Sequence, residues 1–303
     1  EVLKAGGTAA AAAIAASALL AVIEPQSTGI GGDCFALVQP KGTGRIVAYN
    51  GSGRAPAAAK AEWFLERGID AIPLTSPHSV TIPGAIDAWA TILRDHGRFG
   101  FDRVLAPAIK AAAEGYVVAP RIAFDWANGF AKLKKGANTE RYLLPHGKAA
   151  VTGDVITQPE LAQTLRLIAD NGPDGFYKGP VAQDMVATLN KLGGLHTLED
   201  FAGHSTETTS PIGTIYKGFD VWQCPPNGPG ITMLVMLNIL SGFDLAAMGH
   251  NSGSALHLIA EASLAMELGA SASQVGGTTH PHPTLSEIVG EAALVSIGRS
   301  VNF

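Results

Sequence analysis

A glycine-rich stretch at residues 24–35 constrains the fold of this chain more than any other segment. An apolar, alanine-rich run leads into it, and the β-like run at residues 35–38 leaves it. Gly29, Gly31 and Gly32 can adopt positive φ and allow another segment to approach the backbone closely. Such a stretch suits a phosphate-binding loop, a loop beside an active site or a tight corner. The sequence therefore predicts a helix, a glycine-rich crossing and a strand.

The composition indicates a folded protein without a disulfide framework. The chain has 303 residues, of which 47% are hydrophobic and 16% charged, so it can bury a core in one large domain or two ordinary ones. A net charge of −5 and the lack of a basic cluster with interleaved aromatics argue against a nucleic-acid partner. Cys34 and Cys224 lie far apart, and no histidine spacing indicates a metal site. We expect neither a metal nor a cofactor.

The apolar run at residues 9–23 does not predict a membrane segment. It is too short to cross a bilayer, and most of it is alanine, which is weakly hydrophobic. The chain opens in the middle of a pattern at residues 1–4, so we expect that an N-terminal part is missing and that any signal peptide lies outside this sequence. The sequence leaves the cellular location of the protein open, and we slightly favour the cytoplasm.

The periodicity along the chain predicts mixed helices and antiparallel hairpins, hence an α+β fold or a layered arrangement. Helical patterns occur at residues 8–23, 85–95, 105–115, 158–170, 181–192 and 231–240. Hairpins are predicted for residues 34–49 and 212–223, and one further strand for residues 79–84. The stretch at 121–150 is polar and gives no clear prediction.

One arginine is delivered by a polar glycine loop at residues 50–56. Arg54 is therefore a candidate for holding an anion. The alternative interpretation is an ordinary solvated surface arginine, since most arginines are exposed.

Eight motifs then follow one another in a recognisable order. They are AGGTAA at 5–10, EPQSTGIGG at 24–32, SVTIPG at 79–84, LAPA at 105–108, QPELA at 158–162, GFYKG at 175–179, GGLHTLED at 193–200 and PPNGPG at 225–230. This ordered set resembles the gamma-glutamyltransferase family over residues 1–262, which we take as a large-subunit region. Each motif is weak alone, but the order is specific.

The resemblance implies a layered αββα N-terminal-nucleophile hydrolase fold. Members of this family cut themselves before a threonine, whose hydroxyl then attacks an amide with its own α-amine as general base. The product is an acyl-enzyme, which is released to water or to an acceptor amine. The implied partner is a small-molecule amide or a γ-glutamyl or acyl substrate.

One departure from the family pattern bears on the substrate. In gamma-glutamyl enzymes an arginine three residues before the loop's Ala-Pro pair grips the substrate α-carboxylate. Here Ser52 holds that position and Arg54 lies immediately before the pair. Together with residues 227–229 in place of paired serines, this resembles the branch of acylases and oxamate-type amidohydrolases. The implied substrate-binding residues are Arg54, Gly31 and Gly32.

The tail, residues 263–303, resembles a different family. The runs SLAMELGAS at 263–271 and HPHPTLSE at 280–287 are similar to the C-terminal dimerisation segment of lipoamide dehydrogenase. That resemblance implies His282 as an acid/base residue and Glu287 as the carboxylate that orients it. The chain has no Gly-x-Gly-x-x-Gly after a first strand and no closely spaced cysteine pair, so this pair would have nothing to act on.

A threonine in the tail imitates the cleavage site of the hydrolase family. Thr278 precedes a threonine and a histidine, as the nucleophile does in that family, but Pro281 and Pro283 oppose the strand that should follow. The alternative is that this threonine belongs only to the dehydrogenase-like loop. We therefore expect an incomplete, inactive large-subunit fragment whose partner is a missing small subunit or a second copy. Two hypotheses stay open beside it, a non-catalytic assembly fragment and the remnant of a flavin disulfide oxidoreductase.

Overall fold

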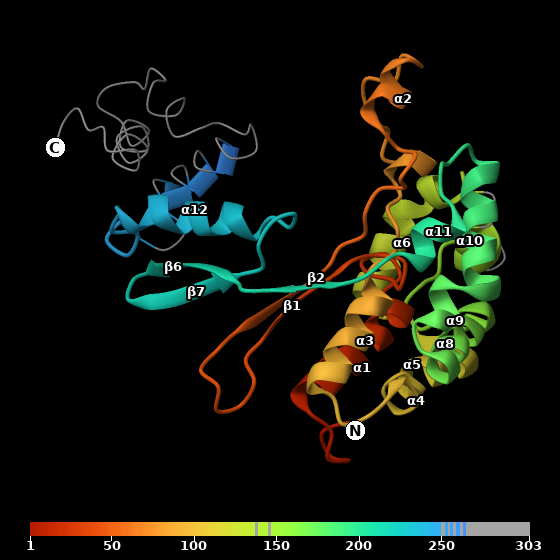
Figure 1. Cartoon of the computed structure of the whole chain (residues 1–303), viewed down its shortest axis with the longest axis horizontal. Helices are drawn as coiled ribbons and strands as arrows, with labels where there is room; N and C mark the ends of the chain where they lie inside the picture. The colour runs from red at the N-terminus through yellow and green to blue at the C-terminus, as the bar shows by residue number, and fades with distance from the viewer. Residues whose placement is uncertain are drawn as a thin grey trace. The chain divides into compact units, whose positions relative to one another are not determined.

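The computed structural model describes residues 1–136, 139–144 and 147–249, with 252–253, 255–256, 259–260 and 263–264 (Figure 1). Two compact units emerge from the contacts between residues. The first comprises Glu1–Gly44 and Tyr49–Thr208, and the second comprises Arg45–Ala48 and the chain from Thr209 onward. The predicted division at residue 262 falls at the edge of the described residues and stays a prediction. None of the described helices combines the length and the apolar content that crossing a membrane requires.

Helix α1, Ala9–Ile23, confirms the helix predicted from the alanine-rich run. The Thr8 side chain caps it by accepting a hydrogen bond from the Ala11 amide at 3.2 Å. The small side chains allow close packing, and α1 lies against α3, α4 and α5. Its buried residues are Ala11, Ile14, Ala15, Ala18, Ala21 and Val22.

Most of the buried residues of the first unit lie on its other helices. They are α2 Ala61–Leu65, α3 Ala85–His96, α4 Phe101–Val104, α5 Ala106–Glu114, α6 Pro120–Leu133, α7 Thr139–Leu143, α8 Pro159–Asn171, α9 Asp174–Tyr177, α10 Gly179–Lys191 and α11 Leu198–Ala202. The apolar positions predicted from periodicity in α3 and α8 are buried, among them Ile86, Trp89, Leu165 and Ile168. Helix α6 occupies the stretch that gave no prediction, with Ile122 and Trp126 buried.

The strands of the first sheet are short. The sheet contains β1 Cys34–Val38, β2 Val47–Gly51 and β5 Glu207–Thr209, in the order β1-β2-β5. Strand β1 has the predicted bounds, residues 34–38. Strand β2 begins at Val47, two residues after the start at residue 45 that was predicted for the second strand of this hairpin. A second, antiparallel pair joins β3 Tyr116–Val117 to β4 Val155–Ile156, with Tyr116 opposite Ile156.

The strand predicted for residues 79–84 is wrong. A 3-10 turn, Pro77–Ser79, occupies its start, and residues 80–84 pass in irregular conformation to the start of α3. The Ile82 amide donates to the Arg54 carbonyl at 3.0 Å, but Pro83 has no N–H to extend a ladder.

The second unit contains a hairpin and a helix. Strands β6 Ile212–Tyr216 and β7 Phe219–Gln223 pair antiparallel with the predicted bounds, and Lys217 and Gly218 at the turn both have positive φ, as a two-residue hairpin turn requires. Helix α12, Gly230–Ser241, packs on β6. Leu240 and Phe243 form the centre of a small core there, and the Lys217 ammonium donates to the Phe243 carbonyl at 3.1 Å.

Candidate functional site

Four segments of the first unit meet at the N-terminus of α3. The first amides of a helix have no partner within the helix, and here Gly84 and Ala85 both donate to the Gly32 carbonyl, at 3.0 and 2.9 Å. No side chain caps this helix. The glycine-rich stretch therefore reaches α3 through a backbone carbonyl.

Three other glycines permit the closest backbone contacts at this place. A Cβ on Gly53 would lie 1.6 Å from the Ile82 carbonyl oxygen, and one on Gly84 would lie 2.0 Å from the Gly51 oxygen. A Cβ on Gly51 would lie 2.5 Å from the Ala88 Cβ. Any side chain at these positions would force the crossing segments apart.

The expected positive φ at Gly29, Gly31 and Gly32 is wrong, whereas the expected close approach of another segment occurs at Gly32, whose carbonyl accepts the Gly84 and Ala85 amides. None of the three has positive φ. A Cβ on Gly29 or Gly31 would meet no atom within 4 Å. The most crowded crossing lies at Gly51, Gly53 and Gly84. The Gly-Ser-Gly and Pro-Gly sequences in those two segments could have indicated it.

Asp33 fixes the backbone that precedes Arg54. Its Oδ1 accepts the Gly53 amide and its Oδ2 accepts the Ser52 hydroxyl, both at 3.0 Å. Because a carboxylate that receives two hydrogen bonds holds both donors, the loop reaches Arg54 in a defined conformation.

Arg54 itself is exposed and ion-paired. Its Nη2 donates to Oε1 of Glu207 at 2.7 Å, with 78% of the Arg54 side chain and 59% of the Glu207 side chain accessible. Exposed pairs of this kind contribute about 0–1 kcal/mol, so a competing anion could replace the Glu207 carboxylate at little cost. The structure therefore brings Arg54 and Gly32 to one cluster around the start of α3.

A buried hydrogen-bond network connects the start of α3 to α9 and to the segment before β5. The Tyr177 hydroxyl donates to the Pro83 carbonyl at 2.7 Å and accepts the Asp87 amide at 3.2 Å. Asp87 Oδ2 accepts the Thr206 amide at 2.7 Å. Burial raises the pKa of Tyr177, so the hydroxyl stays protonated and keeps donating.

His204 stacks on Tyr177, with ring centroids 5.5 Å apart. Burial lowers the pKa of His204; the Asp87 and Asp33 carboxylates oppose this shift, and the Arg54 cation adds to it. His204 is therefore neutral near pH 7. No sequence pattern indicated that this histidine belongs to the cluster.

The remaining predicted site residues lie outside the described residues. Thr278, His282 and Glu287 are among them, so their roles stay predictions. Within the described chain, no group of three His, Cys, Asp or Glu side chains could hold a metal ion.

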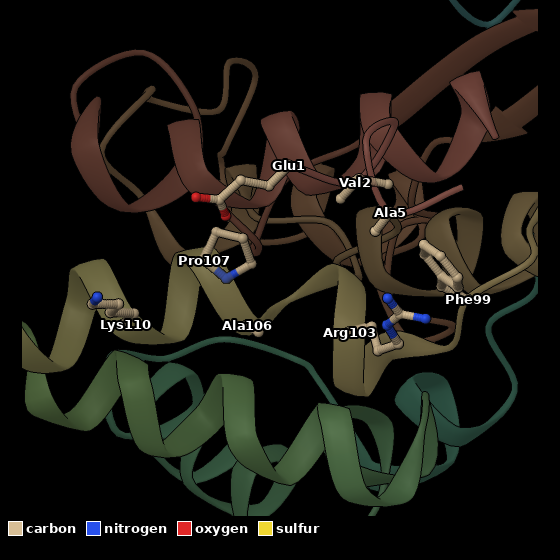
Figure 2. A pocket seen from close by; sticks show the side chains of 8 residues that line it. All are labelled: Glu1, Val2, Ala5, Phe99, Arg103, Ala106, Pro107 and Lys110. Carbon is tan, nitrogen blue, oxygen red and sulfur yellow. The ribbon is translucent and has the colours of Figure 1, made fainter. Parts of the chain in front are cut away.

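A separate pocket of about 260 Å³ contains none of the predicted residues. Figure 2 shows its side chains, which come from the N-terminal segment, α4, α5 and the residues before α4. The Arg103 guanidinium lies over the Phe99 ring there, 3.6 Å from its centroid. Stacking on the ring covers one face of the guanidinium and leaves its N–H edge free, and Lys110 lines the same pocket.

Solved structures of two related enzymes share this fold. The chain superposes on cephalosporin acylase from Bacillus halodurans with a TM-score of 0.83 and 34% identity, over 98% of this chain and 56% of that one. It superposes on gamma-glutamyltranspeptidase of Helicobacter pylori with a TM-score of 0.82 and 27% identity, over 98% and 85%. These matches confirm the predicted α+β, N-terminal-nucleophile hydrolase-like fold.

The sequence comparisons define the family. The gamma-glutamyltranspeptidase family profile matches residues 1–297. The glutathione hydrolase-like YwrD proenzyme of Bacillus subtilis (strain 168) is 37% identical over 263 residues, which cover 86% of this chain and 50% of that protein. The chain belongs to the gamma-glutamyltranspeptidase family, and it spans about half the length of the curated relatives it matches.

Proposed function

We propose that this chain holds the acyl substrate of an amidohydrolase or acyltransferase of the acylase-like branch of its family. The observation that carries the proposal is the exposed Arg54 guanidinium on a backbone fixed by Asp33 and by the Gly53 crossing. Its weak ion pair with Glu207 leaves it able to receive a carboxylate or the carbonyl oxygen of an acyl group.

The site chemistry favours an acylase over a gamma-glutamyl enzyme. At the position where the resemblance expects an arginine, Ser52 donates its hydroxyl to Asp33, so that place carries a carboxylate in the structure. A carboxylate repels an anionic α-carboxylate and tolerates a neutral acyl group. We therefore propose that the Arg54 cation binds the polar end of the substrate. The backbone of Gly31 and Gly32 then forms one wall of the substrate site.

The reaction itself is proposed from the family. A threonine hydroxyl attacks the amide carbonyl carbon, its proton passes through the threonine α-amine to the leaving amine, and the carbon–nitrogen bond breaks. Water or an acceptor amine then releases the acyl group. Because the YwrD proenzyme is about twice as long as the region that matches this chain, we propose that a separate small subunit supplies this nucleophile and that the chain alone is inactive.

The mass of the purified chain tests the source of the nucleophile. We expect one unchanged intact mass after long incubation, together with no release of anilide from N-acyl or γ-glutamyl anilides. A split between Gly277 and Thr278, with turnover that disappears in Thr278→Ala, would overturn the inactive-fragment proposal.

Binding of an acyl anilide with a terminal carboxylate tests Arg54 directly. We expect Arg54→Met to weaken binding about tenfold or more, because it removes a charge-assisted contact, and Arg54→Lys to restore part of it. Arg166→Met, at an exposed arginine on α8, is the matched control and should bind as the unaltered chain does. Equal binding by all variants would exclude Arg54 from the site.

A non-catalytic assembly role is a second candidate. Helix α12 is apolar on all sides, and Ile231, Met233 and Val235 are each more than 40% exposed. Exposed apolar surface of this kind invites association. Light scattering that shows a monodisperse monomer would argue against this candidate.

The similarity of residues 263–303 to a dehydrogenase tail is a third hypothesis, with its own test. The family match extends to residue 297 and so overlaps most of this tail. If the tail belongs to a flavin disulfide oxidoreductase, the purified protein should be yellow and absorb as a flavin does. A colourless protein would remove that interpretation, and with it the acid/base roles of His282 and Glu287.

A further inference from the structure

We propose that a pocket along α6 is a binding site for a small carboxylate with an aromatic or other apolar body. The pocket has a volume of about 500 Å³, within the roughly 300–1,000 Å³ typical of ligand pockets. One wall is the start of the glycine-rich stretch, and the other is α6 with the end of α7. It is lined by Pro25, Gln26, Ser27, Arg121, Asp125, Trp126, Gly129, Lys132, Leu133 and Leu143.

The polar side of the pocket carries a net positive charge. Arg121 donates through Nε to Asp125 at 2.8 Å, which neutralises one charge but uses only one nitrogen of the guanidinium. Lys132, also on the pocket wall, makes no ion pair with any described residue. Arg121 and Lys132 are eleven residues apart on one helix, about 16 Å along its axis, so they lie at different ends of the pocket. In a chain of net charge −5, the Lys132 ammonium, which has no carboxylate partner among the described residues, favours an anion at its end of the pocket.

The other side of the pocket is apolar and includes a buried aromatic ring. Trp126 is 3% exposed, and Leu133 and Leu143 are half-buried beside it. Such a surface accommodates a flat apolar body while the Lys132 ammonium, next to Leu133 in the chain, orients the carboxylate.

Gly129 keeps this pocket open at a cost to the helix. A glycine inside a helix is less favourable than alanine, yet nothing in the packing requires one here. A Cβ on Gly129 would meet only the Leu133 Cδ1, at an ordinary 3.9 Å. Its lack of a side chain therefore leaves room in the pocket.

Calorimetric titration of the full chain tests the site without any need for turnover. We expect 2-naphthaleneacetate to bind saturably, and 2-naphthaleneethanol and acetate to bind at least about tenfold more weakly, because each lacks one of the two recognised features. Equal binding of the acid and the alcohol, or of the acid and acetate, would overturn the proposal, as would no saturable binding of the acid.

Two variants place the ligand in this pocket. Gly129→Leu should keep or raise the melting temperature and abolish binding, since the new side chain fills the cavity. Lys132→Gln should weaken the acid about tenfold and leave the alcohol unchanged, whereas Lys191→Gln, which alters the last-turn lysine of α10, should change neither. Unchanged binding in Gly129→Leu would put the ligand elsewhere and contradict the proposal.

Discussion

Two groups of glycines belong to the segments that meet at the start of α3, and they do opposite things. Gly51, Gly53 and Gly84 are crowded, and no side chain fits where their backbones cross. Gly29 and Gly31 face open space. The crowded group fixes the fold, whereas the open group leaves room that a ligand or another polypeptide can use. A glycine-rich sequence alone does not reveal which of these roles a glycine has.

Gly53→Ala should give the largest effect. Its Cβ would lie 1.6 Å from a backbone oxygen that cannot move without displacing the Ile82 segment. We expect a loss of about 3 kcal/mol or more in the free energy of unfolding, or failure to fold. Urea denaturation measures this. A stable variant would show that the crossing relaxes easily, and the contrast between the two groups would disappear.

Tyr177→Phe probes the buried side of the same crossing. It leaves the Pro83 carbonyl without its donor and the Asp87 amide without its acceptor, so we expect a loss of about 1–3 kcal/mol in unfolding free energy. Tyr142→Phe, at a side chain that is 40% exposed, is the control and should be nearly neutral. Equal losses in both variants would argue against a special role for the network.

His204 should make stability depend on pH. Because burial lowers its pKa in the folded state, the unfolded chain takes up a proton near pH 6.5 that the folded chain resists. Stability should therefore fall as the pH drops from about 7.5 to 5.5. The slope should be smaller in His204→Asn, measured by urea denaturation across that range. An unchanged slope would assign the titration to another group.

The exposed ion pair should contribute little to stability. We expect Arg54→Met and Glu207→Gln each to change the unfolding free energy by no more than about 0.5–1 kcal/mol, with a coupling in the double variant of about 0.2–1 kcal/mol. A larger coupling would mean that Arg54 is a structural residue, and it would weaken its proposed role in binding.

Gly31→Ala should have the smallest effect. Its φ is not positive and its Cβ would be unobstructed, so stability should stay the same or rise by up to about 1 kcal/mol. If Gly31 borders the substrate, the variant should bind the acyl anilide more weakly while it remains stable. A clear loss of stability would place Gly31 with the crowded group.

Local chemistry determined much of this protein in advance. The helix at residues 8–23, the helices at 85–95 and 158–170, and the hairpin at 212–223 each depend on residues a few positions apart, and the structure confirms these predictions. Helix α6 was not predicted, although Ile122, Trp126 and Leu133 recur at helical spacing within the stretch at 121–150.

The site was only partly accessible to the same reasoning. Arg54 and Gly32 were predicted to bind substrate, and this role stays a prediction; the structure places the backbones of both residues against the segment that starts α3. Glu207, which holds Arg54, is 153 residues away along the chain, and His204 and Tyr177 join the cluster through packing that no local pattern encodes. The sequence by itself determined which segments are helices and hairpins, because caps, turns and periodicity act over a few residues. Only the tertiary structure decided which glycines are crowded and which charges meet, because those depend on how distant segments cross.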